Sequence, residues 1–424
     1  MNFFMYSKCG EGAGLMKRLK EEGNDCAINI LEDDYSDVYD GILPKERAPK
    51  PDAIVIFDSS GMGARADRLR ESGFSIFGGS KFHDRLECDR DFGLEFMTKN
   101  DIRIPETTVF ADFATGIDFI RKNSKKRYVF KPSGKSVPAH LTYVGSDAED
   151  LIIFMGFVEK NYFNDIDDFI LQEFVEGSII SSEYWVGANG FIEPINHTVE
   201  AKKFMNDDIG PSTGCSGNLV WFGEESTELA RLLRHTEIAL MQEGFLGPID
   251  INCIVNEKGI YGLEWTPRFG LDAMPSLLAA LGCDIGEVIS DAVQGVKTQM
   301  DFRSAFSGGI RITIPPYPIE PESIKSMEKL APNKGIPIRG LEGPDCEVYF
   351  YEVKLDDELL VHSSGTGVIA CVSSTSDDSE SCFDFPLDVL NEAKIPDKQY
   401  RTDLGSVLPE MHRKAVEVLD AVWS

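Results

Sequence analysis

The segment from Gly247 to Gly270 limits what this chain can fold into more than any other segment does. It contains two stretches of strand-forming residues, Ile249–Val255 and Ile260–Trp265, and the residues between them, 256–259, are typical of a tight turn. In the first stretch polar and apolar residues alternate, as they do in a strand with one face against a core. The segment therefore predicts two antiparallel strands joined in a hairpin.

Four polar side chains of this predicted hairpin would lie on one face. Residues two apart in a strand point the same way, so Asp250 lies beside Asn252, and Glu264 lies beside Thr266. Hairpin pairing would bring Asn252 near Glu264. Oxygen ligands of this kind suit Mg²⁺ bound with a nucleotide, and Arg268, just beyond them, can neutralise charge on a transferring phosphoryl group. The alternative is a hairpin whose polar face is simply hydrated.

The same segment resembles the metal-binding signature of the ATP-grasp carboxylate–amine ligases, in which a glutamate ends the second strand and an arginine follows it. Its Pro-Arg-Phe-Gly run, residues 267–270, resembles the form found in phosphoribosylamine–glycine ligases. Thr266 replaces the asparagine that the family usually has two residues after the glutamate. The resemblance implies ATP and Mg²⁺ (or Mn²⁺) as cofactors, with Arg268 catalytic and a metal-binding set of Asp250, Asn252, Glu264 and Thr266.

The composition argues against several classes of function. A formal net charge of −29 opposes binding to nucleic acids and to anionic membranes. The nine cysteines are scattered, with no CxxC pair, and the chain has neither a signal peptide nor an apolar run of about eighteen residues. We therefore expect a cytoplasmic protein with reduced thiols and no membrane segment, which acts on a small-molecule carboxylate and amine as a monomer or a homodimer.

Residues 1–100 predict a parallel α/β domain. Strands are expected at 2–6, 53–57 and 74–77, and helices are expected after the glycine-rich stretch 7–14 and over 64–72. Alternation of strands and helices is typical of a parallel sheet with helices on its faces. The glycine-rich stretch either cradles a phosphate on its backbone N–H groups or forms only a tight turn into the helix.

The resemblance runs in order along most of the chain and implies a multidomain α/β and α+β fold. The expected parts are an N-terminal parallel α/β domain over 1–100, an ATP-grasp centre over 101–305 with a lid at about 107–170, and a small C-terminal mixed α/β domain over 306–424. The Tyr400–Gly405 run resembles the closing motif of the family's C-terminal domain. Apolar residues at helical spacing also predict one long helix over 224–243.

Two basic residues are candidates for binding the nucleotide phosphates. Lys131 ends a predicted strand, and a short loop over 132–137 that contains Lys135 follows it. A lysine is a mobile point charge that suits phosphate, and the resemblance implies that Lys131 contacts the α- and β-phosphates of ATP, with Lys135 in the lid. Arg90, in the predicted helix 89–100, is the nearest candidate for a further phosphate contact. The alternative for Arg90 is a solvated helix arginine.

The segment 168–177 resembles the hinge at which this family binds the adenine base. The resemblance implies that backbone groups of the hinge face the base and that nearby acids bind the ribose. Glu183 is a candidate because the family's usual glutamate is replaced by Ile179 here. For the hinge acids the alternative is a capped strand end. The implied nucleotide-binding residues are Glu173, Phe174, Val175, Glu176 and Glu183.

The most specific local match is the segment 202–217, which resembles the family's glycine-rich loop after a basic pair. A loop rich in glycine, serine and threonine can seat an acyl phosphate or a carboxylate on its backbone N–H groups. The resemblance implies that Lys202 or Lys203, both candidate catalytic residues, reaches the phosphates, and it implies a place in the nucleotide site for Gly214. Cys215 either carries a reactive thiol or fills a tight loop as a small residue.

Together these features predict an ATP-dependent carboxylate–amine ligase similar to the phosphoribosylamine–glycine ligases. The resemblance implies that a carboxylate attacks the γ-phosphate of ATP to give an acyl phosphate, and that an amine then displaces phosphate to form an amide. Two of the family's phosphoribosylamine-binding loops are absent, one of them replaced by Phe57–Met62. The alternatives are therefore a ligase for a different amine or amino acid, and a nucleotide-binding protein that has lost catalysis.

Overall fold

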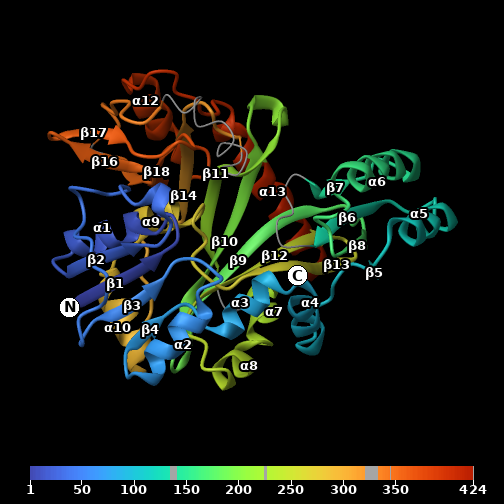
Figure 1. The fold of residues 1–424 in the computed structure, drawn as a ribbon, viewed down its shortest axis with the longest axis horizontal. Helices are drawn as coiled ribbons and strands as arrows, with labels where there is room; N and C mark the ends of the chain where they lie inside the picture. Colours follow the sequence, from blue (N-terminus) through green and yellow to red (C-terminus); the bar gives the residue numbers. More distant parts are fainter. Residues whose placement is uncertain (134–140, 224–226, 320–332, 344, 424) are drawn as a thin grey trace.

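The computed structural model describes residues 1–133, 141–223, 227–319, 333–343 and 345–423. They form three larger sheets, a two-stranded hairpin and the helices that cover them (Figure 1). Along these ranges, no helix combines the length and the apolar character needed to cross a membrane. Lys135, predicted to lie in the lid, falls outside the described residues.

The N-terminal sheet is parallel, as predicted, with strand order β2-β1-β3-β4. Its core strands are apolar along their whole length because helices cover both faces of such a sheet. The elements of this part are β1 (Asn2–Ser7), α1 (Ala13–Glu21), β2 (Asp25–Ile30), β3 (Ile54–Phe57), α2 (Gly63–Glu71), β4 (Ser75–Phe77), α3 (Lys81–Cys88) and α4 (Arg90–Lys99).

The glycine-rich loop after β1 uses its backbone N–H groups within the protein. The Gly10 N–H donates to Ser7 Oγ at 2.7 Å, and the Gly12 N–H donates to a carboxylate oxygen of Asp58 at 2.9 Å. Asp58 follows β3, the neighbour of β1, so the two loops meet where both strands end. Of the two alternatives for this stretch, the geometry favours a tight turn into α1.

The largest sheet has eight antiparallel strands in the order β13-β12-β9-β10-β11-β14-β18-β15. It continues across residue 305, because β14 pairs with β11. The polar hairpin predicted from the sequence forms one edge of this sheet. The strands are β9 (Ser178–Gly187), β10 (Gly190–Lys203), β11 (Ser212–Gly223), β12 (Gly247–Asn256), β13 (Gly259–Thr266), β14 (Phe306–Thr313), β15 (Glu347–Phe350) and β18 (Val368–Ser376).

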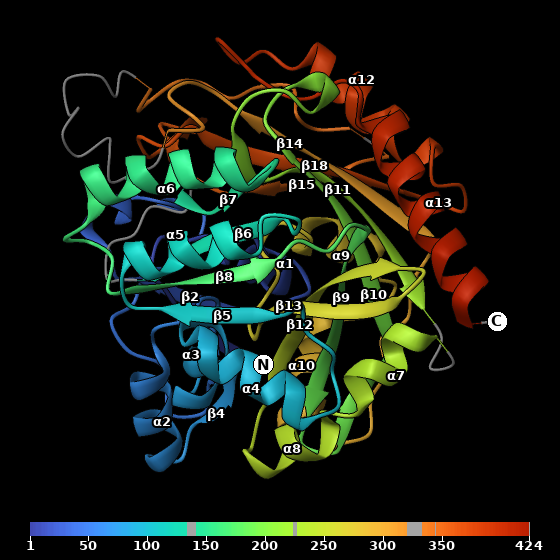
Figure 2. The ribbon, with the colours of Figure 1, turned by 90° about the vertical axis from the view of Figure 1, so that its right-hand side faces the viewer.

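A separate lobe carries the third sheet, with strand order β5-β8-β6-β7 and two helices on one face (Figure 2). Side chains from this sheet and its helices form a hydrophobic cluster of their own, which includes Phe130, Met155 and Phe169. The lobe therefore has its own packed core. Its elements are β5 (Thr107–Phe110), α5 (Phe113–Lys122), β6 (Tyr128–Ser133), β7 (Tyr143–Val144), α6 (Ala148–Tyr162) and β8 (Asp168–Glu173).

The expectation of one long helix over 224–243 is wrong in part. The described residues there form two short helices, α7 (Glu228–Arg234) and α8 (Glu237–Gln242). Thr236 lies between them, and both its N–H and its hydroxyl donate to the Leu233 carbonyl, at 2.9 and 2.7 Å. This competition by a threonine side chain for backbone acceptors breaks the helix although the apolar spacing continues.

The C-terminal region packs helices on both faces of the large sheet. Ser276 of α9 donates to Asn218 on one face, while His412 of α13 contacts the ring of Trp221 on the other. Neighbouring residues of β11 alternate in this way because side chains in a strand alternate between faces. The remaining elements are α9 (Met274–Ala280), α10 (Ile285–Gln294), β16 (Val353–Asp356), β17 (Leu359–His362), α12 (Asp384–Glu392) and α13 (Leu404–Trp423).

Replacing Gly63 by alanine should destabilise the N-terminal part. A Cβ atom at Gly63 would lie 2.2 Å from the backbone of Ser80, so α2 and the start of α3 would have to separate. We expect Gly63→Ala to lower the free energy of unfolding by about 1–3 kcal/mol. The readout is the midpoint of thermal unfolding. Gly156→Ala is the control, because nothing lies within 4 Å of that site in α6 and alanine favours a helix. A Gly63→Ala protein that melts at or above the wild-type temperature would contradict this packing.

Candidate functional site

The hairpin of β12 and β13 presents its four polar side chains on one face, as predicted. Asn252 lies opposite Glu264, and Asp250 lies opposite Thr266. Partners directly across an antiparallel ladder share a face. The amide nitrogen of Asn252 points at Asp250 Oδ1, 3.5 Å away. A carboxylate, an amide and a hydroxyl group therefore stand in two rows at the edge of the large sheet.

Glu183 of β9 extends one of these rows and forms a buried carboxyl pair with Asp250. They lie opposite each other on β9 and β12, and each is 6% exposed. Trp185 Nε1 donates to Glu183 at 3.0 Å, and Ser181 Oγ donates to Asp250. Burial raises the pKa of Glu183 to about 7, and burial together with the charge of Glu183 raises the pKa of Asp250 well above its usual range. The pair therefore retains a proton at neutral pH.

Three cations from different elements lie within electrostatic range of Glu264. Arg90 begins α4, Lys131 lies in β6 of the third sheet, and Lys202 lies near the end of β10. Burial lowers the pKa of each cation, and the charge of Glu264 raises it. The net pKa is lowered for Arg90 and Lys131 and raised for Lys202. Arg90 Nη1 also donates to the Lys131 carbonyl at 3.2 Å. Lys202 lies 3.3 Å from Glu200, which helps to raise its pKa overall.

Arg268 joins the hairpin to the loops of the N-terminal sheet. Its guanidinium donates to Glu87 Oε1 at 2.8 Å and to the Phe269 carbonyl at 3.0 Å. Glu87 in turn accepts a hydrogen bond from Ser60 in the loop after β3. Burial alone would lower the pKa of Arg268, but the charge of Glu87 and those of more distant acids raise it. Arg268 is therefore a fixed positive charge between two polar surfaces.

At the hinge, the protein itself occupies the polar groups of Glu173 and Phe174. β8 ends at Glu173, whose carboxylate accepts from Lys126 Nζ at 2.7 Å. The Phe174 N–H donates to the Arg127 carbonyl at 2.9 Å, and the Arg127 guanidinium lies 4.0 Å from the centre of the Phe174 ring. These contacts fix the start of the hinge against the third sheet.

The rest of the hinge keeps its donor accessible. In the part of the chain that the structure describes, the Val175 N–H makes no hydrogen bond. Glu176 is exposed, and its carbonyl accepts from Asn256 at 2.6 Å. Glu183 does not belong to this group, because it lies farther along β9, opposite Asp250. Val175 and Glu176 therefore stay at the hinge, whereas Glu183 lies with the buried acid Asp250.

The glycine-rich loop between β10 and β11 holds the two neighbouring lysines differently. Lys203 Nζ donates to the Gly210 carbonyl at 3.2 Å, so its charge is turned onto the loop itself. Thr213 Oγ1 donates to the Lys202 carbonyl at 3.0 Å. Gly214 lies close to Asp272, since a Cβ atom there would be 3.1 Å from its carboxylate. The Lys202 side chain, by contrast, pairs with Glu200 and lies within electrostatic range of Glu264.

Cys215 packs inside this loop. It is 1% exposed, and its Sγ donates to the Gly217 carbonyl at 3.1 Å. Burial raises the pKa of the Cys215 thiol to about 12, so the thiolate does not form at physiological pH. Of the two alternatives for this residue, the environment favours a small packing residue.

One charged pair near the site was not predicted from the sequence. Arg311 of β14 forms an ion pair with Asp272 and lies 3.4 Å from the hydroxyl of Tyr317. The Arg311 guanidinium also lies 5.5 Å from the centre of the Tyr351 ring. The available signal was an arginine inside an otherwise apolar strand, 306–314. Arg311 therefore lies beside Gly214 and is a second arginine near the site, in addition to Arg268.

The oxygen ligands fit a magnesium ion that arrives with a nucleotide. Among the described residues, no group of three or more His, Cys, Asp or Glu side chains could hold a metal by itself. Nucleotide-bound Mg²⁺ needs only one or two carboxylates, because phosphate oxygens and waters complete its shell. Glu264, Asn252 and Thr266 offer one carboxylate and two neutral oxygens on one face. This set suits Mg²⁺ shared with phosphates.

Comparisons with known proteins find similarity to the phosphoribosylamine–glycine ligases. The model described as phosphoribosylglycinamide synthetase, ATP-grasp (A) domain, matches residues 88–272. The phosphoribosylamine–glycine ligase of Halalkalibacterium halodurans is 24% identical over 351 residues, which are 80% of this chain and 78% of that protein. The region that the family model matches contains the hairpin, the hinge, and Arg90, Lys131 and Lys202.

Two solved structures share the fold. The phosphoribosylamine–glycine ligase of Thermotoga maritima has a TM-score of 0.71 at 17% identity, over 94% of this chain and 99% of that one. The biotin carboxylase domain of Hydrogenobacter thermophilus 2-oxoglutarate carboxylase, a dimer in complex with MgADP, has a TM-score of 0.65 at 13% identity, over 99% of both chains. The whole arrangement of sheets is therefore that of known proteins.

The buried pair predicts a pH-dependent stability. The folded protein binds the Glu183 proton more tightly than the unfolded chain does, so this contribution is full below pH 4.5 and is lost as the pH rises through about 7. Relative to Glu183→Gln, the wild type should lose about 2–3 kcal/mol of unfolding free energy over that interval. Urea unfolding at several pH values measures the difference. Glu176→Gln, at an exposed site, should show no such trend, and a pH-independent difference for Glu183→Gln would contradict the assignment.

Proposed function

The chain is a divergent, phosphoribosylamine–glycine ligase-like member of the ATP-grasp superfamily, an ATP-dependent carboxylate–amine ligase, and we propose that its reaction centre is the polar face of β12 and β13. One observation carries this proposal. The charge of one carboxylate, Glu264, raises the pKa of both Lys131 from the lid sheet and Lys202 from the large sheet. A triphosphate between the two sheets would meet both lysines and the metal ligands of the hairpin.

In the first step, an oxygen of the substrate carboxylate attacks the γ-phosphorus of ATP, and the bond to the β-phosphate oxygen breaks. ADP leaves and an acyl phosphate remains. Lys131, Arg90 and Lys202 hold the phosphates in line and neutralise their charge. Arg268 follows Thr266, just beyond the metal ligands of the hairpin, where it stabilises negative charge on the transferring phosphoryl group.

In the second step, the amine nitrogen attacks the acyl carbon, the bond to the phosphate oxygen breaks, and the amide and inorganic phosphate are released. The attacking nitrogen loses a proton in this step. The protein's task is to keep water away from the acyl phosphate until the amine arrives. The lid lobe suits this task, because its own hydrophobic core allows it to move as a unit over the large sheet.

For the nucleotide base, the hinge offers the accessible N–H of Val175, and Glu176 is the acid within reach of the ribose. Glu173 and Phe174 support the hinge through Lys126 and Arg127. Backbone recognition of this kind selects a base by its hydrogen-bonding edge. It leaves Glu183 to a supporting role with Asp250.

We assign Mg²⁺, or Mn²⁺ in its place, to Glu264, Asn252 and Thr266. When bound with ATP, the ion would supply charge neutralisation at the phosphate oxygens. Asp250 is buried and accepts hydrogen bonds from Ser181 and Asn252, so it orients Asn252 instead of reaching the ion itself. Thr266 offers a hydroxyl oxygen, a weaker ligand than the amide oxygen it replaces.

The partners that we propose are small molecules: a carboxylate, an amine and the nucleotide. The net charge of −29 opposes complexes with nucleic acids. A cytoplasmic location and a monomeric or homodimeric state stay predictions.

The relatives are named for phosphoribosylamine and glycine, so these are the first substrates that we propose. A second candidate acceptor is an amine without a phosphate, favoured by acids at the edge of the parallel sheet. Burial raises the pKa of Asp58 to about 6 and that of Glu352 to about 7, and the charge of Glu11 contributes to both shifts. Burial therefore reduces the charge on Asp58 and Glu352, and the exposed Glu11 is the acid that would repel a phosphate and attract an ammonium group.

Removing the metal ligand or the arginine should stop turnover without unfolding the protein. We expect Glu264→Gln and Arg268→Gln each to lower the rate of ADP release by about 100-fold or more, since each removes charge from the transition state. Glu257→Gln, in the turn of the same hairpin, is the matched control and should keep the wild-type rate. Wild-type turnover in both variants would contradict the assigned centre.

Omitting one component at a time tests the reaction itself. The assay measures ADP release with ATP, Mg²⁺, glycine and freshly made phosphoribosylamine, and then with phosphate-free amines. Release that requires both glycine and phosphoribosylamine supports the first pair of substrates. Release that requires glycine and a phosphate-free amine supports the second candidate. No release in any combination, with ATP still bound, would contradict a ligase and favour a nucleotide-binding protein without catalysis.

A further inference from the structure

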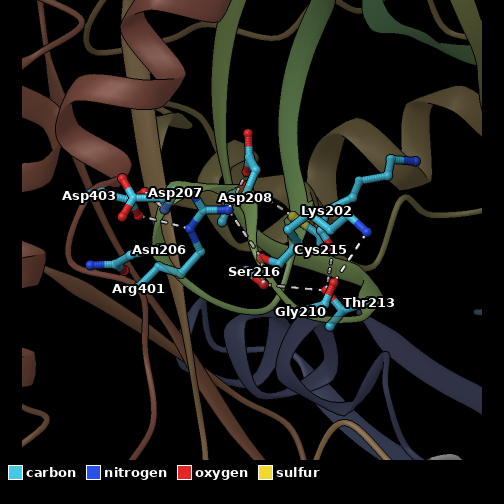
Figure 3. A network of polar contacts seen from close by, with 12 residues as sticks. Lys202, Asn206, Asp207, Asp208, Gly210, Thr213, Cys215, Ser216, Arg401 and Asp403 are labelled. Atoms are coloured by element: carbon cyan, nitrogen blue, oxygen red, sulfur yellow. Dashed lines mark hydrogen bonds and ion pairs between the residues drawn. The ribbon is translucent and has the colours of Figure 1, made fainter.

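A buried arginine in the C-terminal region holds the loop that follows Lys202. Arg401 is 1% exposed and lies just before α13, where it faces the tip of the β10–β11 hairpin (Figure 3). The tip and Arg401 are almost 200 residues apart in sequence, as the contacts between Arg401 and Asp208 show. The mechanism proposed above uses no residue from this region.

The guanidinium of Arg401 joins three groups at once. Its Nε and Nη2 donate to the two carboxylate oxygens of Asp403 at 2.8 and 2.7 Å. Its Nη1 donates to Asp208 Oδ1 at 2.7 Å and to the Lys203 carbonyl at 3.1 Å. Only a planar fork with several donors can make these contacts together. Asp403 therefore orients the arginine, and the arginine holds the loop.

Further hydrogen bonds dock the same loop on the C-terminal segment. Asn206 and Thr402 bond each other twice, at 2.8 and 3.1 Å, and the Asp207 N–H donates to Asp403 at 2.9 Å. Asp207 and Asp208 have φ values of +58° and +52°, a backbone region that side chains disfavour. The loop is therefore held in a conformation that its own residues would not prefer.

These contacts reach the reaction centre through the end of β10. The Lys203 carbonyl accepts from both Arg401 and Ser216, the latter at 2.9 Å, while the neighbouring Lys202 carbonyl accepts from Thr213. Both carbonyls at the end of the strand are thus fixed. The backbone from which the Lys202 side chain extends toward Glu264 is held from the loop side by Arg401.

We propose that Arg401 is a positioning residue for the ligase reaction: through the Lys203 carbonyl and Asp208 it fixes the loop that sets the place of Lys202. The inference rests on the proposed function, in which Lys202 contacts the transferring phosphates. It assigns to the C-terminal region a part in the phosphoryl-transfer step, in addition to any part in holding the acceptor.

The test is Arg401→Lys, which keeps the charge but loses the fork. We expect kcat for ADP release to fall about tenfold or more, with the KM for ATP changed less than about threefold, because a misplaced Lys202 harms the transition state more than ground-state binding. Amide hydrogen exchange in residues 203–216 should become faster. The matched control is Arg413→Lys, an exposed arginine of α13 paired with Glu410, which should leave all three quantities unchanged.

A second variant tests the same inference in case the Arg401→Lys protein does not fold. Asp208 is mostly exposed, so Asp208→Asn replaces its ion pair with Arg401 by at most a neutral hydrogen bond without opening a core, and it should give a smaller loss of kcat with the same faster exchange. A folded Arg401→Lys protein with kcat within about twofold of wild type would overturn the inference. A loss of kcat with unchanged exchange in 203–216 would also overturn it. An inactive wild type would instead overturn the proposed function, and the exchange data would then decide alone whether Arg401 holds the loop.

Discussion

The site depends on the register in which β9, β12 and β13 pair. This register lines up two rows of polar side chains, and a slip of one residue would turn each row to the opposite face. On the other face Trp265 holds it in place: Trp265 is buried, and its Nε1 donates to the Gly93 carbonyl at 3.0 Å. The rows are Ser181, Asn252 and Glu264, and Glu183, Asp250 and Thr266.

The same register explains why an acidic chain can hold a site for a polyanion. Most of its excess negative charge is spread along the sequence, whereas Arg90, Lys131 and Lys202 converge on a single carboxylate. In the buried layer, Glu183 and Asp250 keep a proton and so contribute less than two negative charges. Local geometry, and not the net charge, therefore sets the field that a triphosphate would meet.

The features that could be predicted from the sequence are those that depend on residues close together in the chain. The hairpin, the parallel N-terminal sheet and a strand that contains Lys131 depend on nearby patterns, and the structure has all three, although this strand continues to Ser133 instead of ending at Lys131. The break between α7 and α8 was not predicted, because one threonine bonds back to the preceding turn while the apolar spacing continues. Glu183 was a candidate to replace the family's ribose-binding glutamate, whose position is Ile179 here, yet strand pairing places Glu183 opposite Asp250.

Contacts between distant segments had no comparable signal. Arg311 reaches Asp272, and Arg401 reaches Asp208, only because the C-terminal strands extend the sheet that contains β10 and β11. A sequence pattern can flag an arginine in an apolar strand, but it cannot name the partner on another strand. The resemblance marked the run around Arg401 as a motif without giving it a role.

The two lysines of the centre are held in different ways, and this difference bears on the mechanism. Lys202 extends from a strand whose end is fixed by the loop and by Arg401. Lys131 belongs to a lobe with its own core, so it moves when the lid moves. In the proposed cycle, closure brings Lys131 toward phosphates that Lys202 and the hairpin already hold. One charge then stays in place while the other arrives with the lid, so full stabilisation of the transition state requires the closed, dry site.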